Sequence, residues 1–312
     1  MALSGAPARA GEAACWFENG VVVVAAQVMG VTGDFILDTA TPHTQLAETQ
    51  AQAAGFEETA LTGDVRLAGL RITGRPVEVA DLDLRAGALP TPIAGVIGAD
   101  VLRPFVLDVS FAPCRVALNA AGRAQRFPAH RSLPMTWVAG RPVVRATASD
   151  GARSLTANFT PGIGADRTVR LSDVAASAPG AKKLLEVYPY GVLEPALASL
   201  TFAGDIALDL LSGLMHAEDP KLAGQIGAPF LSRYRLRFDF PAGRLELAPG
   251  ATSSPPAKPR GRGTPTSPRS ARTRRGSAGC RRWRAGGRPA AATGCAPRAP
   301  RTARRGVTAW RS

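Results

Sequence analysis

The chain has 312 residues and a formal net charge of +14 at pH 7, a balance that taken alone suggests a nucleic-acid-binding protein. The charge is confined to one end, because residues 251–312 hold 16 of the 38 Lys and Arg and no Asp or Glu. Residues 1–250 therefore carry 22 basic and 24 acidic side chains and are nearly neutral. We expect no specific nucleic-acid partner for this part of the chain.

The first predicted elements are short strands. Residues 1–17 are predicted as an N-terminal extension, and they lack the basic start and long apolar stretch that make a signal peptide visible. Strands are predicted at residues 21–28, 34–37 and 65–79, with a short helix at residues 46–54. No apolar run reaches the ~18–20 residues of a membrane-spanning helix, so we expect no transmembrane segment.

An internal repeat is the strongest fold signal. Residues 95–118 (GVIGADVLRPFVLDVSFAPCRVAL) and 224–247 (GQIGAPFLSRYRLRFDFPAGRLEL) are identical at nine of 24 positions. Each copy predicts a strand that ends at an Ile-Gly pair, then a short helical turn and a two-stranded hairpin. The pairs are Ile97-Gly98 and Ile226-Gly227. One repeat of this length indicates two copies of a supersecondary unit, not a solenoid.

The repeat divides the chain into predicted domains. Residues 18–120 form the first lobe and residues 133–250 the second, after a boundary near residues 121–132. Residues 251–312 are rich in Arg, Pro, Gly, Ser and Ala and have almost no large apolar side chains, so we predict a disordered tail. Such a tail is either a solvated low-complexity extension or a segment that contacts polyanions nonspecifically through its charge.

The candidate active residue is the carboxylate in Phe35-Ile36-Leu37-Asp38-Thr39-Ala40, which directly follows an apolar strand. This stretch, followed by the two Ile-Gly units, resembles the retropepsin-like aspartic proteases in a bacterial two-lobe form, over about residues 18–248. The resemblance implies a mainly β fold of two pseudo-repeated acid-protease-like lobes. It also implies that an Asp from each lobe meets the other at the interface and shares one proton with it, since two close carboxylates cannot both ionise.

The resemblance assigns roles in the first lobe. Asp38 matches the catalytic Asp, and Thr39 matches the residue whose hydroxyl braces the two loops. Ala40 departs from the usual Gly. The pair Ile97-Gly98 matches the apolar-Gly pair beneath the loop, and residues 64–79 lie where a flap hairpin is expected.

The second lobe departs further, because no carboxylate stands at the equivalent position. Aligned from the preceding strand, Thr160-Pro161-Gly162 takes the place of Asp-Thr-Gly; aligned backward from Thr168, Gly162-Ile163-Gly164 does. Two functions stay open. The chain is an aspartic peptidase that hydrolyses peptide bonds with an Asp-activated water, or it is a pseudo-peptidase that binds peptides in the cleft between the lobes. Both imply a peptide or protein partner, and neither needs a metal or other cofactor.

Two cysteines fall in the first half of the chain. A disulfide between Cys15 and Cys114 is one interpretation if the protein is exported, and two free or buried thiols are the other. The family resemblance favours an exported or periplasmic protein. Cys280 and Cys295, in the tail, have no Cys or His at metal-ligand spacing.

Overall fold

The structure is a computed structural model that describes residues 11–149, 154–172, 196–202, 205–211, 214–215 and 219–250. These residues all belong to one compact unit, Met1–Lys258. The tail predicted at residues 251–312, with its proposed contacts to polyanions, lies outside the described residues. In the part of the chain that is described, no helix is long and apolar enough to cross a membrane.

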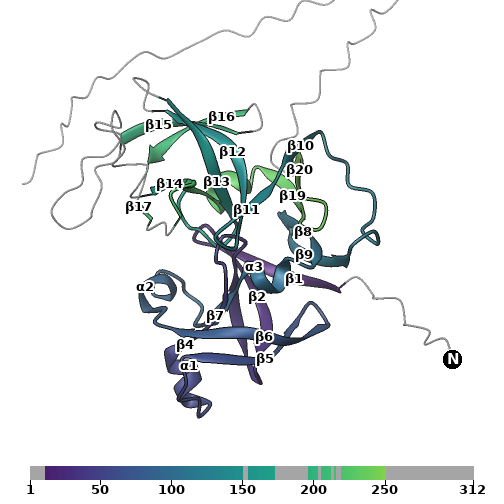
Figure 1. Ribbon diagram of the computed structural model, residues 1–312, viewed down its shortest axis with the longest axis vertical. Helices are drawn as coiled ribbons and strands as arrows, with labels where there is room; N and C mark the ends of the chain where they lie inside the picture. The colour runs from purple at the N-terminus through teal and green to yellow at the C-terminus, as the bar shows by residue number, and fades with distance from the viewer. Residues whose placement is uncertain are drawn as a thin grey trace, which may run out of the picture. The chain divides into compact units, whose positions relative to one another are not determined.

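The first half of the described chain is built on a sheet in which β1, β2, β3, β7, β4, β6 and β5 are neighbours in that order (Figure 1). The apolar run at residues 21–24 is buried throughout, as a central strand requires. The elements are β1 (Gly11–Glu18), β2 (Val21–Val28), β3 (Val31–Leu37), β4 (Thr44–Ala47), α1 (Glu48–Ala53), β5 (Ala60–Leu67), β6 (Leu70–Ala80), α2 (Asp83–Ala86), β7 (Ile93–Ile97), α3 (Ala99–Leu102), β8 (Phe105–Phe111) and β9 (Cys114–Ala120).

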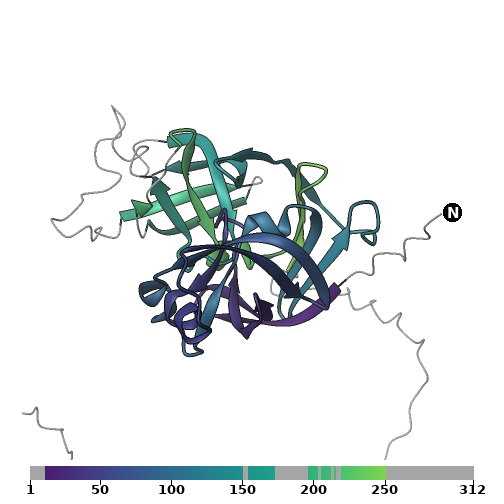
Figure 2. The same cartoon turned by 60° about the horizontal axis from the view of Figure 1, so that its bottom comes forward.

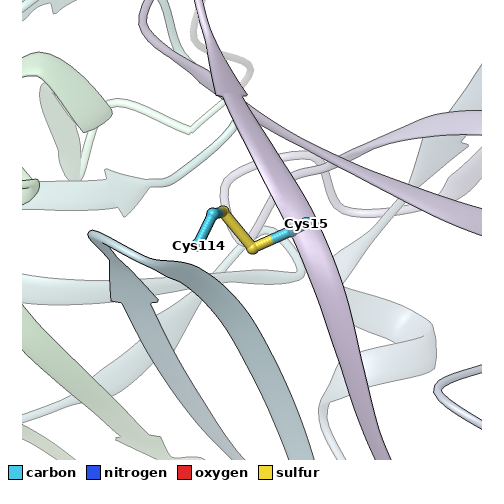
Figure 3. Close-up of a disulfide and its surroundings, with 2 residues drawn as sticks. All are labelled: Cys15 and Cys114. Atoms are coloured by element: carbon cyan, nitrogen blue, oxygen red, sulfur yellow. A yellow bond between two sulfur atoms is a disulfide. The ribbon is translucent and has the colours of Figure 1, made fainter.

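Strand β1 begins within the segment predicted as an N-terminal extension. It pairs with β2 and also with β9, where Gly11 lies opposite Leu118. The sequence GEAACWFE has no β-branched residues, and only Trp16 and Phe17 favour a strand, so the segment was not predicted as one. Figure 3 shows that the Cys15–Cys114 disulfide ties β1 to β9, with the two Cα atoms 5.0 Å apart. The two cysteines of the first half are therefore bridged.

The second half has its own sheet, whose described strands run in the order β16, β15, β12, β13, β18, β14 and β17. Figures 1 and 2 both show these teal and green strands on one side of the unit and the violet and blue strands of the first half on the other. The elements are β10 (Arg131–Pro134), β11 (Thr136–Val138), β12 (Arg141–Ser149), β13 (Ser154–Gly162), β14 (Val169–Ser172), β15 (Ala196–Phe202), β16 (Asp205–Leu211), β17 (Leu214–Met215), β18 (Leu222–Gly227), α5 (Ala228–Leu231), β19 (Tyr234–Asp239) and β20 (Arg244–Pro249).

The two hairpins that follow the Ile-Gly pairs meet edge to edge, because β8 pairs antiparallel with β19. Asp108 lies opposite Arg237, its own counterpart in the repeat, so the two copies are related by a local twofold axis that passes between these residues. The Arg237 guanidinium donates two hydrogen bonds to the Asp108 carboxylate, of 2.6 and 2.7 Å. This contact joins the two halves at the repeat itself.

The main apolar core crosses from one half to the other. It contains Phe35 of β3, Phe159 of β13 and Phe238 of β19, all fully buried. The order of pairing is also the same in the two halves, since β3 lies parallel to β7 and antiparallel β4 follows, while β13 lies parallel to β18 and antiparallel β14 follows. The predicted fold class, mainly β with two related lobes and short helices, is confirmed.

Candidate functional site

Asp38 follows the last residue of β3, at the point where this strand runs beside β7. Leu37 lies opposite Ile97, and the Asp38 N–H donates to the Ile97 carbonyl at 3.0 Å. The loop that begins here is buried: Asp38 is 2% exposed and Thr39 is fully buried. The apolar strand therefore delivers a carboxylate into the protein interior, where it must be hydrogen-bonded or paired.

The pairing of the second half decides between the two alignments of the second loop. Pro161 lies opposite Ile226, just as Leu37 lies opposite Ile97. Since Ile226 and Ile97 are equivalent in the repeat, Gly162 takes the place of Asp38. The alignment with Gly162-Ile163-Gly164 is thus the structural one, and the alignment that put Thr160 at the position of Asp38 is wrong. Thr160 and Pro161 lie in β13, before the loop.

The two loops are joined by Thr39. Its hydroxyl donates to the Pro161 carbonyl at 2.5 Å and accepts the N–H of Ile163 at 3.3 Å. The Thr160 hydroxyl, by contrast, is buried and has no hydrogen-bond partner in the part of the chain that the structure describes. Thr39 therefore bridges the two loops by itself. This bridge is present although only one of the two loops carries an Asp.

The Ile-Gly pairs lie directly beneath these loops. Ile97 and Ile226 are fully buried. A Cβ placed on Gly98 would lie 2.6 Å from the carbonyl carbon of His43, and one placed on Gly227 would lie 1.9 Å from the Arg167 carbonyl oxygen. Both positions require glycine because another backbone segment passes too close for a side chain.

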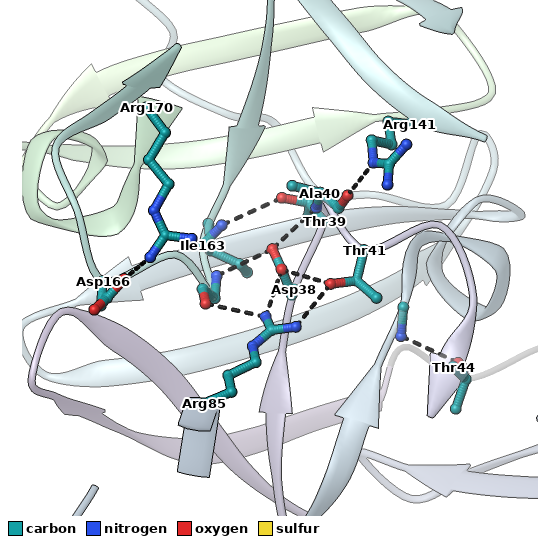
Figure 4. A network of polar contacts seen from close by, with 12 residues as sticks. Asp38, Thr39, Ala40, Thr41, Thr44, Arg85, Arg141, Ile163, Asp166 and Arg170 are labelled. Carbon is teal, nitrogen blue, oxygen red and sulfur yellow. Dashed lines mark hydrogen bonds and ion pairs between the residues drawn. The ribbon is translucent and has the colours of Figure 1, made fainter. Parts of the chain in front are cut away.

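The Asp38 carboxylate receives four hydrogen bonds, shown in Figure 4. Its Oδ1 accepts the Ala40 N–H at 3.0 Å and the Gly164 N–H at 3.3 Å. Its Oδ2 accepts the Thr41 hydroxyl at 2.7 Å and Arg85 Nη2 at 2.6 Å. A carboxylate offers about four lone-pair sites, so all of them are in use.

These contacts decide the charge of Asp38. Burial taken alone would raise the pKa of this carboxyl group. The positive charge of Arg85, the Ala40 N–H and the hydrogen bonds from Thr41 and Arg85 outweigh burial, so the pKa of Asp38 is lowered. Asp38 is therefore an ionised, buried carboxylate whose acceptor sites are filled by protein donors, not a member of a pair that shares a proton.

Arg85 is the residue that the sequence analysis missed. It lies on α2, and besides Asp38 it donates to the Thr41 hydroxyl at 3.0 Å and to the Gly164 carbonyl at 3.1 Å. It thereby contacts both loops. Arg85 is the only basic residue between Arg75 and Arg103, which is the one sequence signal that singles it out. Its spacing of 47 residues from Asp38 gave no reason to pair them.

The hairpin of β5 and β6 does not act as the expected flap. Its turn at residues 68–69 lies against β1, since a Cβ on Gly11 would lie 2.2 Å from the Ala68 carbonyl oxygen. Pairing of β5 with β2 holds the hairpin in the sheet, and of its residues only Glu78 lines the cavity at Asp38. The short helix α2 contributes Leu84 and Arg85 to that cavity instead.

A cavity of about 690 Å³ opens at Asp38 between the two halves. Its charged lining consists of three arginines and three carboxylates, with His43 beside them. Asp166, which follows the second loop, is held by Arg170 at 2.7 Å and by Arg167 at 3.4 Å, so it does not replace the missing carboxylate. The charged lining residues are Asp38, Glu78, Arg85, Arg141, Asp166 and Arg170, and the apolar Leu84 lines the same cavity.

Comparison with known proteins concerns the fold. No protein-family model and no curated protein matches the sequence. Among solved structures, the chain is similar to an aspartic proteinase from Irpex lacteus, at 14% identity over 78% of this chain and 98% of that chain, with a TM-score of 0.47. It is also similar to Basic 7S globulin from soybean, at 13% identity over 78% of this chain and 95% of that chain, again with a TM-score of 0.47. The roles of Asp38 and Arg85 therefore rest on their own geometry.

The position opposite Asp38 has no space for a second carboxylate. A Cβ on Gly162 would lie 2.6 Å from Gln225 Nε2, 2.8 Å from Ala40 Cβ and 3.1 Å from Asp38 Oδ1. A Cβ on Gly164 would lie 2.5 Å from Asp38 Cβ. The two loops therefore pack directly against Asp38. Among the described residues, no cluster of His, Cys, Asp or Glu could hold a metal ion.

Proposed function

We propose that this protein is a retropepsin-like peptidase homologue of the bacterial two-lobe form that binds peptides in the cavity at Asp38 without cleaving them. One observation carries the proposal: Arg85 pairs with Asp38 at 2.6 Å, on a loop whose counterpart is Gly162-Ile163-Gly164. In an aspartic peptidase, a second, protonated carboxyl group stabilises the ionised Asp. Here the positive charge of Arg85 stabilises the Asp38 carboxylate instead.

The chemistry of peptide hydrolysis supports binding over cleavage. An aspartic mechanism needs one ionised carboxylate to activate a water and one protonated carboxyl to polarise the scissile carbonyl. Asp38 has its four acceptor sites filled and its pKa lowered, so it is a poor base for a water. No described acid stands opposite it, since Gly162 and Gly164 occupy that place.

The cavity supports a peptide as the ligand. Its volume of about 690 Å³ lies in the range of sites that bind small molecules or a few residues of a chain. Backbone groups and polar side chains from both halves line it, among them Gln45, Gly164 and Gln225. Such groups can hydrogen-bond the amides of an extended peptide.

Two measurements with the purified full chain test the proposal. The first is incubation with unfolded protein substrates from acidic to neutral pH, analysed by mass spectrometry, for the native chain and for Asp38→Asn. The second is titration calorimetry with short unstructured peptides. We expect binding and no cleavage. Cleavage that Asp38→Asn abolishes would replace the proposal with an active peptidase, and absence of peptide binding would remove it.

We also propose that the protein works in an oxidising compartment, as an exported or periplasmic protein. The Cys15–Cys114 disulfide supports this, because such bridges persist mainly outside the reducing cytosol. Alkylation of the denatured protein isolated from its native host, with and without reductant, tests it. Labelling of both thiols without reductant would count against the proposal.

A further inference from the structure

We infer that the cavity selects peptides that carry a carboxylate, and that Arg141 is the side chain that binds it; this rests on the proposed peptide binding and names the ligand class of the same site. Arg141 is the first residue of β12 and lines the cavity from the second half. Figure 4 shows it beside the loop of Asp38, where its Nε donates to the Ala40 carbonyl at 3.0 Å. That bond fixes the orientation of the guanidinium group.

Arg141 differs from the other two arginines of the cavity in having no carboxylate partner among the described residues. Arg85 pairs with Asp38 at 2.6 Å, and Arg170 pairs with Asp166 at 2.7 Å. Arg141 makes no ion pair with any described residue, and its Nη1 is buried without a hydrogen-bond partner. Nη1 itself is out of a ligand's reach, but Arg141 as a whole is only partly buried and lines the cavity, so its unbalanced positive charge is available to a ligand. A carboxylate is the anion that matches guanidinium geometry best.

None of the three carboxylates that line the cavity pairs with Arg141. Asp38 and Asp166 are already held by arginines, and Asp166 contacts Arg167 as well as Arg170. Glu78 also lines the cavity, but its side chain makes no ion pair or hydrogen bond with a described residue. The total charge of the lining is balanced, so the preference comes from the position of Arg141 and not from a general positive field.

The peptide also needs an apolar residue. Leu84, on α2, lines the cavity and is 99% exposed, which leaves its side chain free for contact with a ligand. An apolar side chain that covers Leu84 would gain hydrophobic free energy in addition to the charge-assisted hydrogen bonds at Arg141. The fitting class is therefore a short extended peptide with one acidic group and aliphatic residues.

The experiment uses three sets of short peptides of Ala and Leu, with the native chain. The first set is acetylated and amidated and carries one Glu at each position in turn. The second replaces that Glu by Gln, and the third is the Gln set with a free C-terminal carboxylate, which separates a side-chain carboxylate from a chain end. Titration calorimetry should show at least one carboxylate peptide binding about tenfold tighter than its neutral match.

Two variants locate the effect. Arg141→Met keeps the aliphatic stem and should abolish the preference, and Arg141→Lys should retain part of it. Arg145→Met is the matched control, because Arg145 is an exposed arginine of the same strand and does not line the cavity. It should bind like the native chain. Unfolding curves of each variant show whether it is folded.

The outcomes separate the two claims. Equal affinity of the native chain for the acidic and neutral peptides overturns the inference and leaves the proposed peptide binding in place. A carboxylate preference that survives undiminished in folded Arg141→Met also overturns it. Absence of binding by every peptide removes the proposed function together with the inference.

Discussion

Arg85 Nη2 lies 2.6 Å from Asp38 Oδ2, although 47 positions separate these residues in the sequence, and both line the same cavity. The carboxylate is 3% exposed and the guanidinium side chain 30% exposed. Asp38 thus depends on Arg85 for its charge balance, whereas Arg85 still reaches water.

Removing Arg85 should cost more stability than removing Asp38. Arg85→Met leaves a buried, ionised carboxylate without its counter-charge, and we expect a loss of about 3 kcal/mol at pH 7. Asp38→Asn leaves an arginine that water can solvate, and the amide oxygen still accepts backbone N–H groups, so we expect about 1–2 kcal/mol. Urea unfolding of both variants measures this. A smaller loss for Arg85→Met than for Asp38→Asn would contradict the assignment.

The contribution of Asp38 should depend on pH in a defined direction. The pKa of Asp38 is lowered in the folded protein relative to its ordinary value of 3.8. Its stabilisation is therefore fully present above that value and is lost as the pH falls through the lower folded-state pKa. The difference in unfolding free energy between the native chain and Asp38→Asn should be constant from pH 7 to pH 5 and should shrink below about pH 4. A difference that grows on acidification would show a raised pKa.

Restoring a second carboxylate by a single substitution should fail. Gly162→Asp would bring a Cβ within 3.1 Å of Asp38 Oδ1 and add a second buried charge there. We expect a loss of about 3 kcal/mol or more at pH 7 and no gain of peptide cleavage. Ala121→Asp, at an exposed turn position, is the control and should change stability little. A stable Gly162→Asp protein that cleaves peptides would refute this account of the loop.

The two threonines of the site should respond in opposite ways to loss of the hydroxyl. Thr39→Val removes the acceptor of the Ile163 N–H and the donor to the Pro161 carbonyl, and we expect a loss of about 1–3 kcal/mol. Thr160→Val removes a buried hydroxyl that has no partner among the described residues, so it should be neutral or stabilising. Thermal and urea unfolding of the pair measure the difference. Equal effects would mean that Thr39 does not bridge the loops.

Reduction of the disulfide should destabilise the unit. The bridge joins residues 99 positions apart, and loop entropy for such a separation corresponds to about 4–5 kcal/mol. The urea midpoint should fall in reductant and in the Cys15→Ser, Cys114→Ser double variant. The double variant should then be insensitive to reductant, which serves as the control. An unchanged midpoint in reductant, with intact mass showing both thiols free, would contradict the prediction.

Local patterns in the sequence were enough for the strands around the site. The apolar run before Asp38 and the Ile-Gly pairs at Ile97 and Ile226 are short-range signals of buried strands and close turns, and the structure has them there. Strand β1 was missed because its sequence has no β-branched residues, although the Asn19-Gly20 turn to β2 is a hairpin signal. Its second partner, β9, lies about a hundred residues away, and only the tertiary structure supplies that pairing.

The site depended on contacts that no spacing rule describes. The sequence by itself determined that Asp38, which follows an apolar strand, has no carboxylate counterpart in the second half. Residue identities alone decide which side chains can ionise. Only the tertiary structure decided which second-loop residue faces it, since strand pairing fixes the register of Gly162. It alone also brought Arg85 to Asp38, because a buried charge takes its partner from whichever segment the fold places beside it.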